Sequence, residues 1–151
     1  LVRRVSRVIL FAIATMGLAG AARQLPSETE RNRTVVTDFV RLFYEQKDVR
    51  AAFEKHVAAD YIQHNPNIVD GRDAAIAALA PKFSARGARF TIQRIVVDGE
   101  FAVVHLHGQP DPRSPGGAVA DIYRLKQGKI VEHWDVLQPI PVKSINPHPM
   151  F

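Results

Sequence analysis

The stretch VADIYRLKQGKIVEHWDVLQ, residues 119–138, carries the strongest information on the fold of this chain. Apolar and polar side chains alternate on both sides of Gln127-Gly128, and such a pair is typical of a two-residue hairpin turn. The stretch therefore predicts two antiparallel strands, Val119–Lys126 and Lys129–Gln138.

Two earlier segments repeat this alternation. They are Ala88–Val97 and Phe101–Gln109, separated by Asp98-Gly99, which is again typical of a hairpin turn. A loop rich in proline and glycine, residues 110–117, leads from them into the third strand. The four segments predict an antiparallel meander.

The chain before Gly87 has a helical period instead. Ser27 and Glu30 have the spacing of a capping box at the start of a helix. Apolar side chains then recur on one side of that helix. This stripe consists of Val36, Phe39, Val40, Phe43 and Tyr44.

Two more helices are predicted before the meander. The first covers Val49–Val57, and the second covers Ala74–Ala85 and is capped by Asp73. Between them Asp60–Pro66 is expected to be extended, because a proline disfavours helical geometry in the residue before it.

Helices followed by a meander indicate an α+β fold. We expect the N-terminal helices to pack on a curved antiparallel sheet and to form a cone-shaped barrel with an internal pocket. This domain is expected to span residues 27–138, followed by an irregular, proline-rich tail over residues 139–151.

Residues 1–21 have the order of a secretory signal peptide. Three arginines precede an uncharged, mostly apolar run, Val8–Leu18, and Ala19-Gly20-Ala21 is a small-x-small cleavage site. The run is short for a membrane-spanning helix, which needs about 20 residues. We expect a cleaved leader and a periplasmic or secreted protein; an uncleaved anchor and a misassigned start are the alternatives.

Composition excludes several classes of protein. A chain of 151 residues with 46% hydrophobic residues suits one domain with its own core. The absence of cysteine excludes disulfides, thiolate metal sites and a thiol nucleophile. The net charge of +5 falls to +2 without the leader and its three arginines, so no nucleic-acid partner is expected.

Alternation along the hairpin places a carboxylate on an apolar wall. With Gln127-Gly128 as the turn, Leu125 pairs with Ile130 and Asp121 pairs with Trp134. The face expected to line the pocket consists of Val119, Asp121, Tyr123, Leu125, Ile130, Glu132, Trp134, Val136 and Gln138.

The opposite face of the hairpin is expected to lie outside. It consists of Ala120, Ile122, Arg124, Val131, His133, Asp135 and Leu137. Its apolar members would be left uncovered, which predicts a homodimer interface. The alternative is that the C-terminal tail covers this face.

Asp121 is the first candidate for chemistry. Burying a carboxylate without a partner is costly, and a carboxyl group in a water-excluded pocket can act as a general acid or base. The alternative is a structural role, in which a backbone N–H or a buried arginine satisfies the carboxylate.

The second strand of the meander carries a His-x-His pair. Phe101, Val103, His105 and His107 share one face of it, and periodicity alone does not decide which face lies inside. We favour the histidine face, because Phe101 and Val103 lie on it. The alternatives are two metal ligands, completed by His64 or Asp121, and two exposed imidazoles.

His64 and Asn65 precede Pro66 in the extended segment. A polar pair there is expected to line the mouth of the pocket. Asx-turn chemistry before the proline is the alternative.

Several segments together resemble the SnoaL-like polyketide cyclase family. They are Tyr61-Ile-Gln-His64-Asn65-Pro66, Asp70-Gly71, His105-x-His107, Asp121-Ile-Tyr-Arg124, Gly128-Lys-Ile-Val-Glu132-His133-Trp134-Asp135 and Gln138-Pro. The likeness covers roughly residues 30–151 and is greatest to a bacterial subgroup described as predicted aldol-condensation enzymes.

The resemblance implies the cone fold of nuclear transport factor 2, usually as a dimer, with a hydrophobic pocket. It also implies aldol-type ring closure without a metal or organic cofactor. In that chemistry an aspartate is the general acid and base and a histidine assists. Carried onto this chain, these roles fall to Asp121 and His107.

The predicted function is that of a cofactor-free lyase or isomerase acting on a small apolar carbonyl compound. The alternative is a secreted ligand-binding or accessory module of the same fold without catalysis. Contact with a membrane is expected only through an uncleaved leader. The residues expected to contact the substrate are His64, Asn65, His105, Tyr123, Trp134 and Gln138.

Overall fold

The computed structural model describes residues 25–151, so the predicted leader lies outside the described residues. The first helix, α1, spans Glu28–Val40 and begins with the predicted capping box of Ser27 and Glu30. It continues into one π-helical turn, Arg41–Glu45. All five residues of the predicted apolar stripe are buried, which confirms that α1 and this turn present one face to the core.

The next two helices lie close to their predicted positions. Helix α2 spans Val49–His56, and helix α3 spans Arg72–Phe83. The prediction that Asp73 caps α3 is wrong: Gly71 is the N-cap residue, and Asp73 lies in the first turn. Among the described helices, none is long and apolar enough to cross a membrane.

Five strands form one mixed sheet. They are β1 (Val57–Gln63), β2 (Arg89–Asp98), β3 (Phe101–Gln109), β4 (Gly117–Lys126) and β5 (Lys129–Pro139). Their order is β1-β5-β4-β3-β2, in which β1 is parallel to β5 and the other pairs are antiparallel. The α+β fold is therefore confirmed, with an added parallel edge strand where only an extended segment is predicted.

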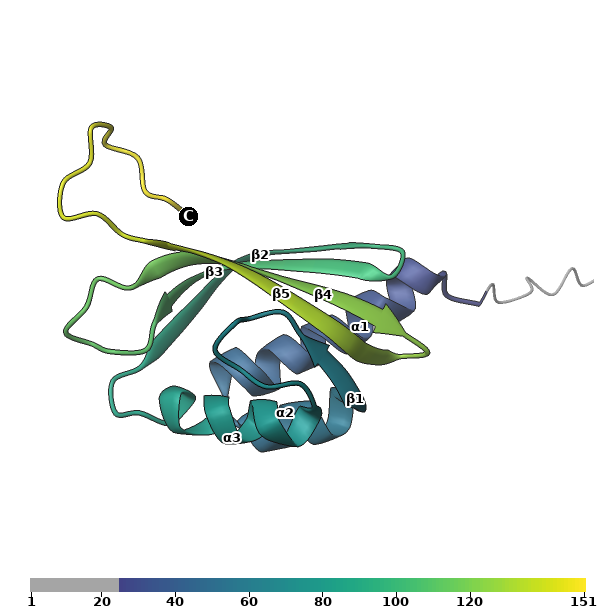
Figure 1. Ribbon diagram of the computed structural model, residues 1–151. Coiled ribbons are helices and arrows are strands. Elements are labelled where there is room, and N and C mark those ends of the chain that lie inside the picture. Colours follow the sequence, from purple (N-terminus) through teal and green to yellow (C-terminus); the bar gives the residue numbers. More distant parts are fainter. Residues whose placement is uncertain (1–24) are drawn as a thin grey trace, which may run out of the picture.

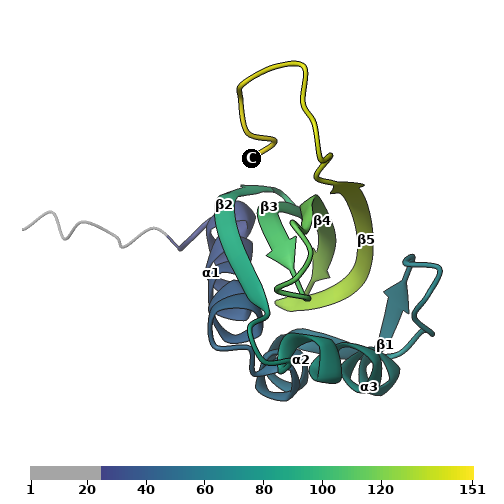
Figure 2. The same cartoon turned by 90° about the vertical axis from the view of Figure 1, so that its left-hand side faces the viewer.

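The helices cover the concave side of the sheet (Figure 1). Strands β2–β5 curl into a half-cone, with α1 along one side and α2 and α3 across the open side (Figure 2). The buried apolar residues of helices and strands form one core between these layers. Residues 140–151 contain no helix or strand, as predicted for the tail, and Phe151 stacks on His107 with ring centroids 4.5 Å apart.

A β-bulge in β5 overturns half of the predicted face pattern. The turn and the pair Leu125–Ile130 are confirmed, but the register then shifts, so that Arg124 pairs with Glu132 and Asp121 with Asp135. Val131 is the extra residue, and a one-residue insertion moves every later side chain to the other face.

The inward assignment of β4 is correct, because Val119, Asp121, Tyr123 and Leu125 are buried. The assignment of β5 beyond the bulge is wrong. His133 is buried, and Asp135 and Leu137 line the internal cavity with it. Glu132, Trp134, Val136 and Gln138 alternate with these residues and lie on the outer face.

The prediction that His105 and His107 face inward is also wrong. Val104 is the residue opposite Asp121 on the neighbouring strand, and directly opposed residues share a face. Ala102, Val104 and Leu106 are accordingly buried, whereas the two histidines are only half-buried. The small apolar residues fill the concave side, and the imidazoles lie on the convex side.

Candidate active site

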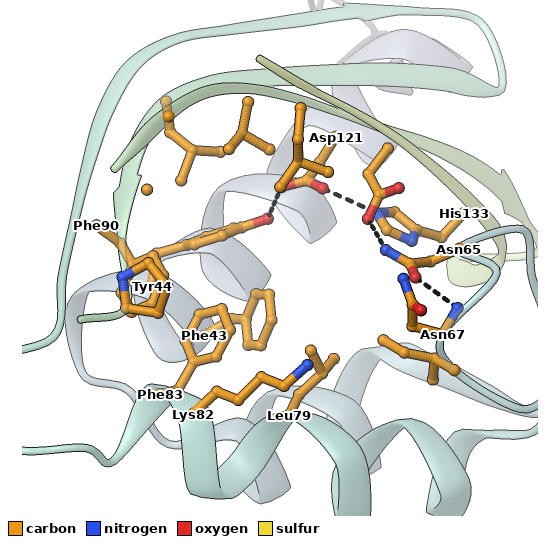
Figure 3. A pocket seen from close by; sticks show the side chains of 18 of the residues that line it. Phe43, Tyr44, Asn65, Asn67, Leu79, Lys82, Phe83, Phe90, Asp121 and His133 are labelled. Atoms are coloured by element: carbon orange, nitrogen blue, oxygen red, sulfur yellow. Dashed lines mark hydrogen bonds and ion pairs between the residues drawn. The ribbon is translucent and has the colours of Figure 1, made fainter. Parts of the chain in front are cut away.

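A cavity of about 680 Å³ lies between the helices and the concave face of the sheet. Its helix side is mostly apolar, with Phe43, Leu79 and Phe83 facing the space beside the amino group of Lys82 (Figure 3). Its sheet side is polar, and Asp121 and His133 are drawn there at the opposite end from the phenylalanines. The volume is within the range of about 300–1,000 Å³ that is usual for small-molecule sites.

Asp121 lies at the centre of the polar side and is 8% exposed. Its Oδ1 lies 2.9 Å from His133 Nε2, and its Oδ2 accepts a hydrogen bond of 2.5 Å from the Tyr44 hydroxyl. The Tyr44 oxygen also lies 2.7 Å from the Tyr123 hydroxyl. Because Tyr44 donates to the carboxylate, the hydroxyl of Tyr123 is the donor in this second bond.

Burial keeps the phenols of the site in their protonated form. It raises the pKa of Tyr44 and of Tyr123 well above the usual value, and the charge of Asp121 raises the pKa of both further. Burial, followed by the charges of Asp121 and Asp135, also raises the pKa of Tyr61. The three phenols are therefore protonated at neutral pH, and each can donate a hydrogen bond.

The histidine partner of Asp121 comes from β5, beside β1. Gln63 and His133 are register partners in the parallel pair, and Gln63 Oε1 lies 2.9 Å from His133 Nδ1. The ring of Tyr123 stacks on the imidazole, with centroids 4.9 Å apart. Both ring nitrogens of His133 therefore have fixed partners.

Two segments that are far apart in the sequence lie side by side here. Gln63-His64-Asn65 lies beside Glu132-His133-Trp134-Asp135. On the inner face Gln63 contacts His133, and the Asn65 amide donates to the Asp135 carboxylate.

On the outer face His64 contacts Glu132 through a bond of 2.8 Å, and its ring stacks on Trp134 at 4.6 Å. The end of β1 and the loop after it therefore contact β5 on both faces of the sheet. These contacts hold the edge of the pocket in place.

The predicted site residues divide into two groups. Asp121, Tyr123 and Asn65 line the cavity, as expected. His64 and Trp134 form the outer contact just described, so their predicted pocket positions are wrong. Gln138 is exposed and lies on the same outer face.

The histidines of β3 have other partners. His105 Nδ1 lies 2.6 Å from an Arg94 guanidinium nitrogen, and His107 Nε2 lies 2.8 Å from the carbonyl oxygen of Pro115. His107 therefore has no access to Asp121 through the sheet, and the predicted assisting role does not fit its position. The alternative of a metal site built from His105, His107 and either His64 or Asp121 has no support in the geometry, because the two histidines of β3 lie on the convex face of the sheet.

His133, Gln63, Asp135 and Tyr44 were missed as site residues. Two of the quoted segments contain His133, Gln63 and Asp135, so a signal was present, but the bulge at Val131 inverted the interpretation of β5. Tyr44 was recognised only as part of the apolar stripe.

One group of potential metal ligands occurs among the described residues. Ligand atoms of Asp121, His133 and Asp135 lie within 4.8 Å of one another. Their remaining polar atoms contact Tyr44, Gln63 and Asn65, respectively. The same three side chains can equally exchange protons, and this is the chemistry that the tight Asp121–His133 contact favours.

The model of the SnoaL-like domain matches residues 36–133, which include Tyr44, Gln63, Asp121 and His133 of the polar cluster. The chain belongs to the SnoaL-like family. No curated protein matches it. The resemblance to the family is thereby confirmed, and the aldol-condensation subgroup stays a prediction.

Solved structures share the fold of this SnoaL-like chain. An NTF2-like protein of unknown function from Mesorhizobium loti has a TM-score of 0.66 at 18% identity, over 76% of this chain and 97% of that one. A protein described as a candidate SnoaL-like polyketide cyclase from Jannaschia has a TM-score of 0.57 at 20% identity, over 77% and 91%.

A third structure is described as that of a candidate isomerase of the SnoaL-like family from Agrobacterium tumefaciens. Its TM-score is 0.56 at 17% identity, over 72% of this chain and 97% of that one. At these identities the three structures establish the shared cone fold alone.

Proposed function

We propose that this protein is a cofactor-free lyase or isomerase that acts on a small apolar carbonyl compound, of the aldol-condensation or cyclase type. The observation that carries the proposal is the buried Asp121–His133 pair at the polar end of an apolar cavity. Neighbours described as a cyclase and an isomerase are consistent with it.

In this mechanism Asp121 removes a proton from the carbon next to a carbonyl group. The electron pair of the broken C–H bond moves to the carbonyl oxygen and forms an enolate. His133 takes the assisting role first expected of His107 and passes a proton to or from Asp121. A positioned base of this kind contributes about 10²–10⁴-fold to a rate.

The apolar side of the cavity supports the choice of substrate. Phe43, Phe83 and Phe90 form a continuous stack, with centroids 4.2 Å apart for the first pair and 4.1 Å for the second. A flat apolar ligand placed against these rings would direct its carbonyl end toward Asp121. Exclusion of water by the rings would strengthen each polar contact to that end.

Hydrogen–deuterium exchange tests the proposal without knowledge of the product. Small ketones and 1,3-diketones are incubated with the protein in deuterated water, and proton NMR follows the loss of the α-hydrogen signal. We expect the wild-type protein to accelerate exchange and Asp121→Asn to lose at least about 10²-fold of that acceleration. Asp73→Asn, at a side chain that is 87% exposed, is the matched control.

Equal acceleration by Asp121→Asn and the wild-type protein would rule the mechanism out. Circular dichroism of both variants shows that any loss is not caused by unfolding.

A second candidate function is ligand binding without chemistry. It is favoured by the hydrogen bonds that already occupy both oxygens of Asp121, and by the absence, among the described residues, of any buried side-chain polar atom without a partner. The same ketones would then raise the melting temperature without accelerating exchange. That pair of results would select the binding function.

A further inference from the structure

The side-chain amide of Gln63 is held in one orientation. Its Oε1 accepts a hydrogen bond of 2.9 Å from the backbone N–H of Asn65, and its Nε2 donates to the Tyr61 hydroxyl at 3.1 Å. A backbone N–H can only donate, so the atom facing it must be the amide oxygen. A flipped amide would direct its NH₂ group at another donor.

The fixed amide determines which nitrogen of His133 carries hydrogen. The same Gln63 oxygen lies 2.9 Å from His133 Nδ1. An amide oxygen can only accept, so Nδ1 must be the donor and must be protonated. The assignment follows from the hydrogen-bond network, as it must when hydrogens are not observed.

With Nδ1 protonated, the state of the other ring nitrogen, Nε2, depends on one proton that it shares with Asp121. His133 Nε2 and Asp121 Oδ1 lie 2.9 Å apart and hold one proton between them. The pair is either a neutral acid beside a neutral imidazole, or a carboxylate beside an imidazolium. Moving the proton from Oδ1 to Nε2 interconverts the two forms and requires no other group.

We propose that Gln63 is a positioning residue that holds His133 as the Nδ1–H form and so directs its Nε2 at Asp121. The value of this arrangement for turnover rests on the proposed function, but the protonation pattern itself rests on the contacts of Gln63. The charged or titratable groups near the ring are Asp121 and Tyr123 on β4, Asp135 on β5 and Tyr61 on β1. Among the described residues, none of these four groups forms a hydrogen bond with Nδ1.

Heteronuclear NMR of the imidazole nitrogens tests this in the protein without ligand. The signals of His133 are assigned from their loss in His133→Phe. In the wild-type protein we expect the Nδ1 signal to be that of a protonated nitrogen at neutral and at alkaline pH. A wild-type His133 with hydrogen on Nε2 and none on Nδ1 at alkaline pH would overturn the proposal.

Two variants separate positioning from a merely structural role. Gln63→Glu keeps an acceptor for Asn65 and for His133, so Nδ1 should keep its hydrogen. Gln63→Leu removes the acceptor, and Nδ1 should then lose its hydrogen in part of the population. Gln93→Leu, at an exposed position of β2, is the matched control and should change neither signal.

A fully protonated Nδ1 in the folded Gln63→Leu variant, unchanged from the wild-type protein, would also overturn the proposal. This outcome is independent of the ketone exchange experiment. The pattern of protonation can fail while Asp121 still exchanges α-hydrogens, and it can hold in a protein that only binds its ligand.

Discussion

At the scale of single residues, the stability of the site depends most on the hydroxyl of Tyr44. It lies between the carboxylate of Asp121 and the hydroxyl of Tyr123 and is fully enclosed. Hydrogen bonds to charged groups contribute more than neutral ones, and a buried oxygen that loses its donor keeps its full desolvation cost. The two tyrosines should therefore differ in how much they stabilise the fold.

We expect Tyr44→Phe to lower the free energy of unfolding by about 1–3 kcal/mol, because it leaves one oxygen of Asp121 without its donor. Tyr123→Phe should cost less, about 0.5–1.5 kcal/mol, because Tyr44 still donates to the carboxylate. Urea unfolding at neutral pH measures both. Equal losses would show that the carboxylate does not depend on Tyr44.

The inward position of Asp121 could be predicted from the sequence, because β4 is regular and its alternation is unbroken. The role of His133 could not, since it depends on which side of a bulge the residue lies. A bulge of one residue leaves the composition unchanged, and it shifts the phase of the alternation without a residue type that marks its position. The contact between Gln63 and His133 joins residues 70 positions apart, and no local pattern contains it.

At the scale of elements, the loop between β3 and β4 depends on glycine. Gly116 has a φ of +80°, a left-handed conformation that favours glycine, and a Cβ there would press on the Gly108 carbonyl oxygen and lie 2.9 Å from His107 Nε2. Gly71 also has a positive φ, of +99°, but a Cβ there would meet nothing within 4 Å. A substitution at Gly71 would therefore cause backbone strain alone, whereas one at Gly116 would also cause a steric clash.

We expect Gly71→Ala to lower the free energy of unfolding by roughly 1–3 kcal/mol through strain alone. Gly116→Ala should cost more, because the backbone of β3 must also move away. Thermal or urea unfolding of the two variants measures the difference. A smaller loss for Gly116→Ala than for Gly71→Ala would contradict the steric argument.

The order and kind of the predicted elements agree with the structure where local signals are strong: the capping box of α1, the turn at Gln127-Gly128 and the alternation of β3 and β4. Two features of the sheet have no such signal. The parallel pairing of β1 with β5 needs the whole helical half of the chain to be in place. The face of β3 is fixed by the strand opposite it.

At the scale of the whole molecule, the helices cover only the concave face of the sheet (Figure 1). The outer face exposes Val96, Phe101 and Val136, which are 57%, 44% and 62% exposed. Leu137, which the sequence predicts on this face, lines the cavity instead. The tail reaches this face where Phe151 stacks on His107.

The homodimer stays a prediction, and its interface is expected on the outer face of the sheet that carries Val96, Phe101 and Val136. Sedimentation should give a mass near two chains for the wild-type protein and a shift toward one chain for Val136→Glu, because a charge there would be buried in the interface. Val142→Glu, in the tail at 97% exposure, is the control. A wild-type mass near one chain would remove the dimer.

The packing of α1 against α2 makes stability depend on pH. His56 at the end of α2 lies 2.8 Å from the Asp38 carboxylate of α1. Burial lowers the pKa of His56, and hydrogen bonds from Lys55, Arg41 and His56 hold the pKa of Asp38 well below its usual range. In both cases the unfolded chain binds protons more readily than the folded one, so stability falls as pH falls.

Two pH windows follow from these two groups. The contribution of His56 is complete above about pH 6.5 and declines below it, whereas the contribution of Asp38 is complete above about pH 3.9 and is lost at more acidic pH. Urea unfolding between pH 8 and pH 5 should therefore show a decline that is smaller in His56→Gln than in the wild-type protein. His148→Gln, at an exposed position of the tail, should leave the decline unchanged. Parallel curves for the wild-type protein and His56→Gln would mean that the acid sensitivity arises at other groups.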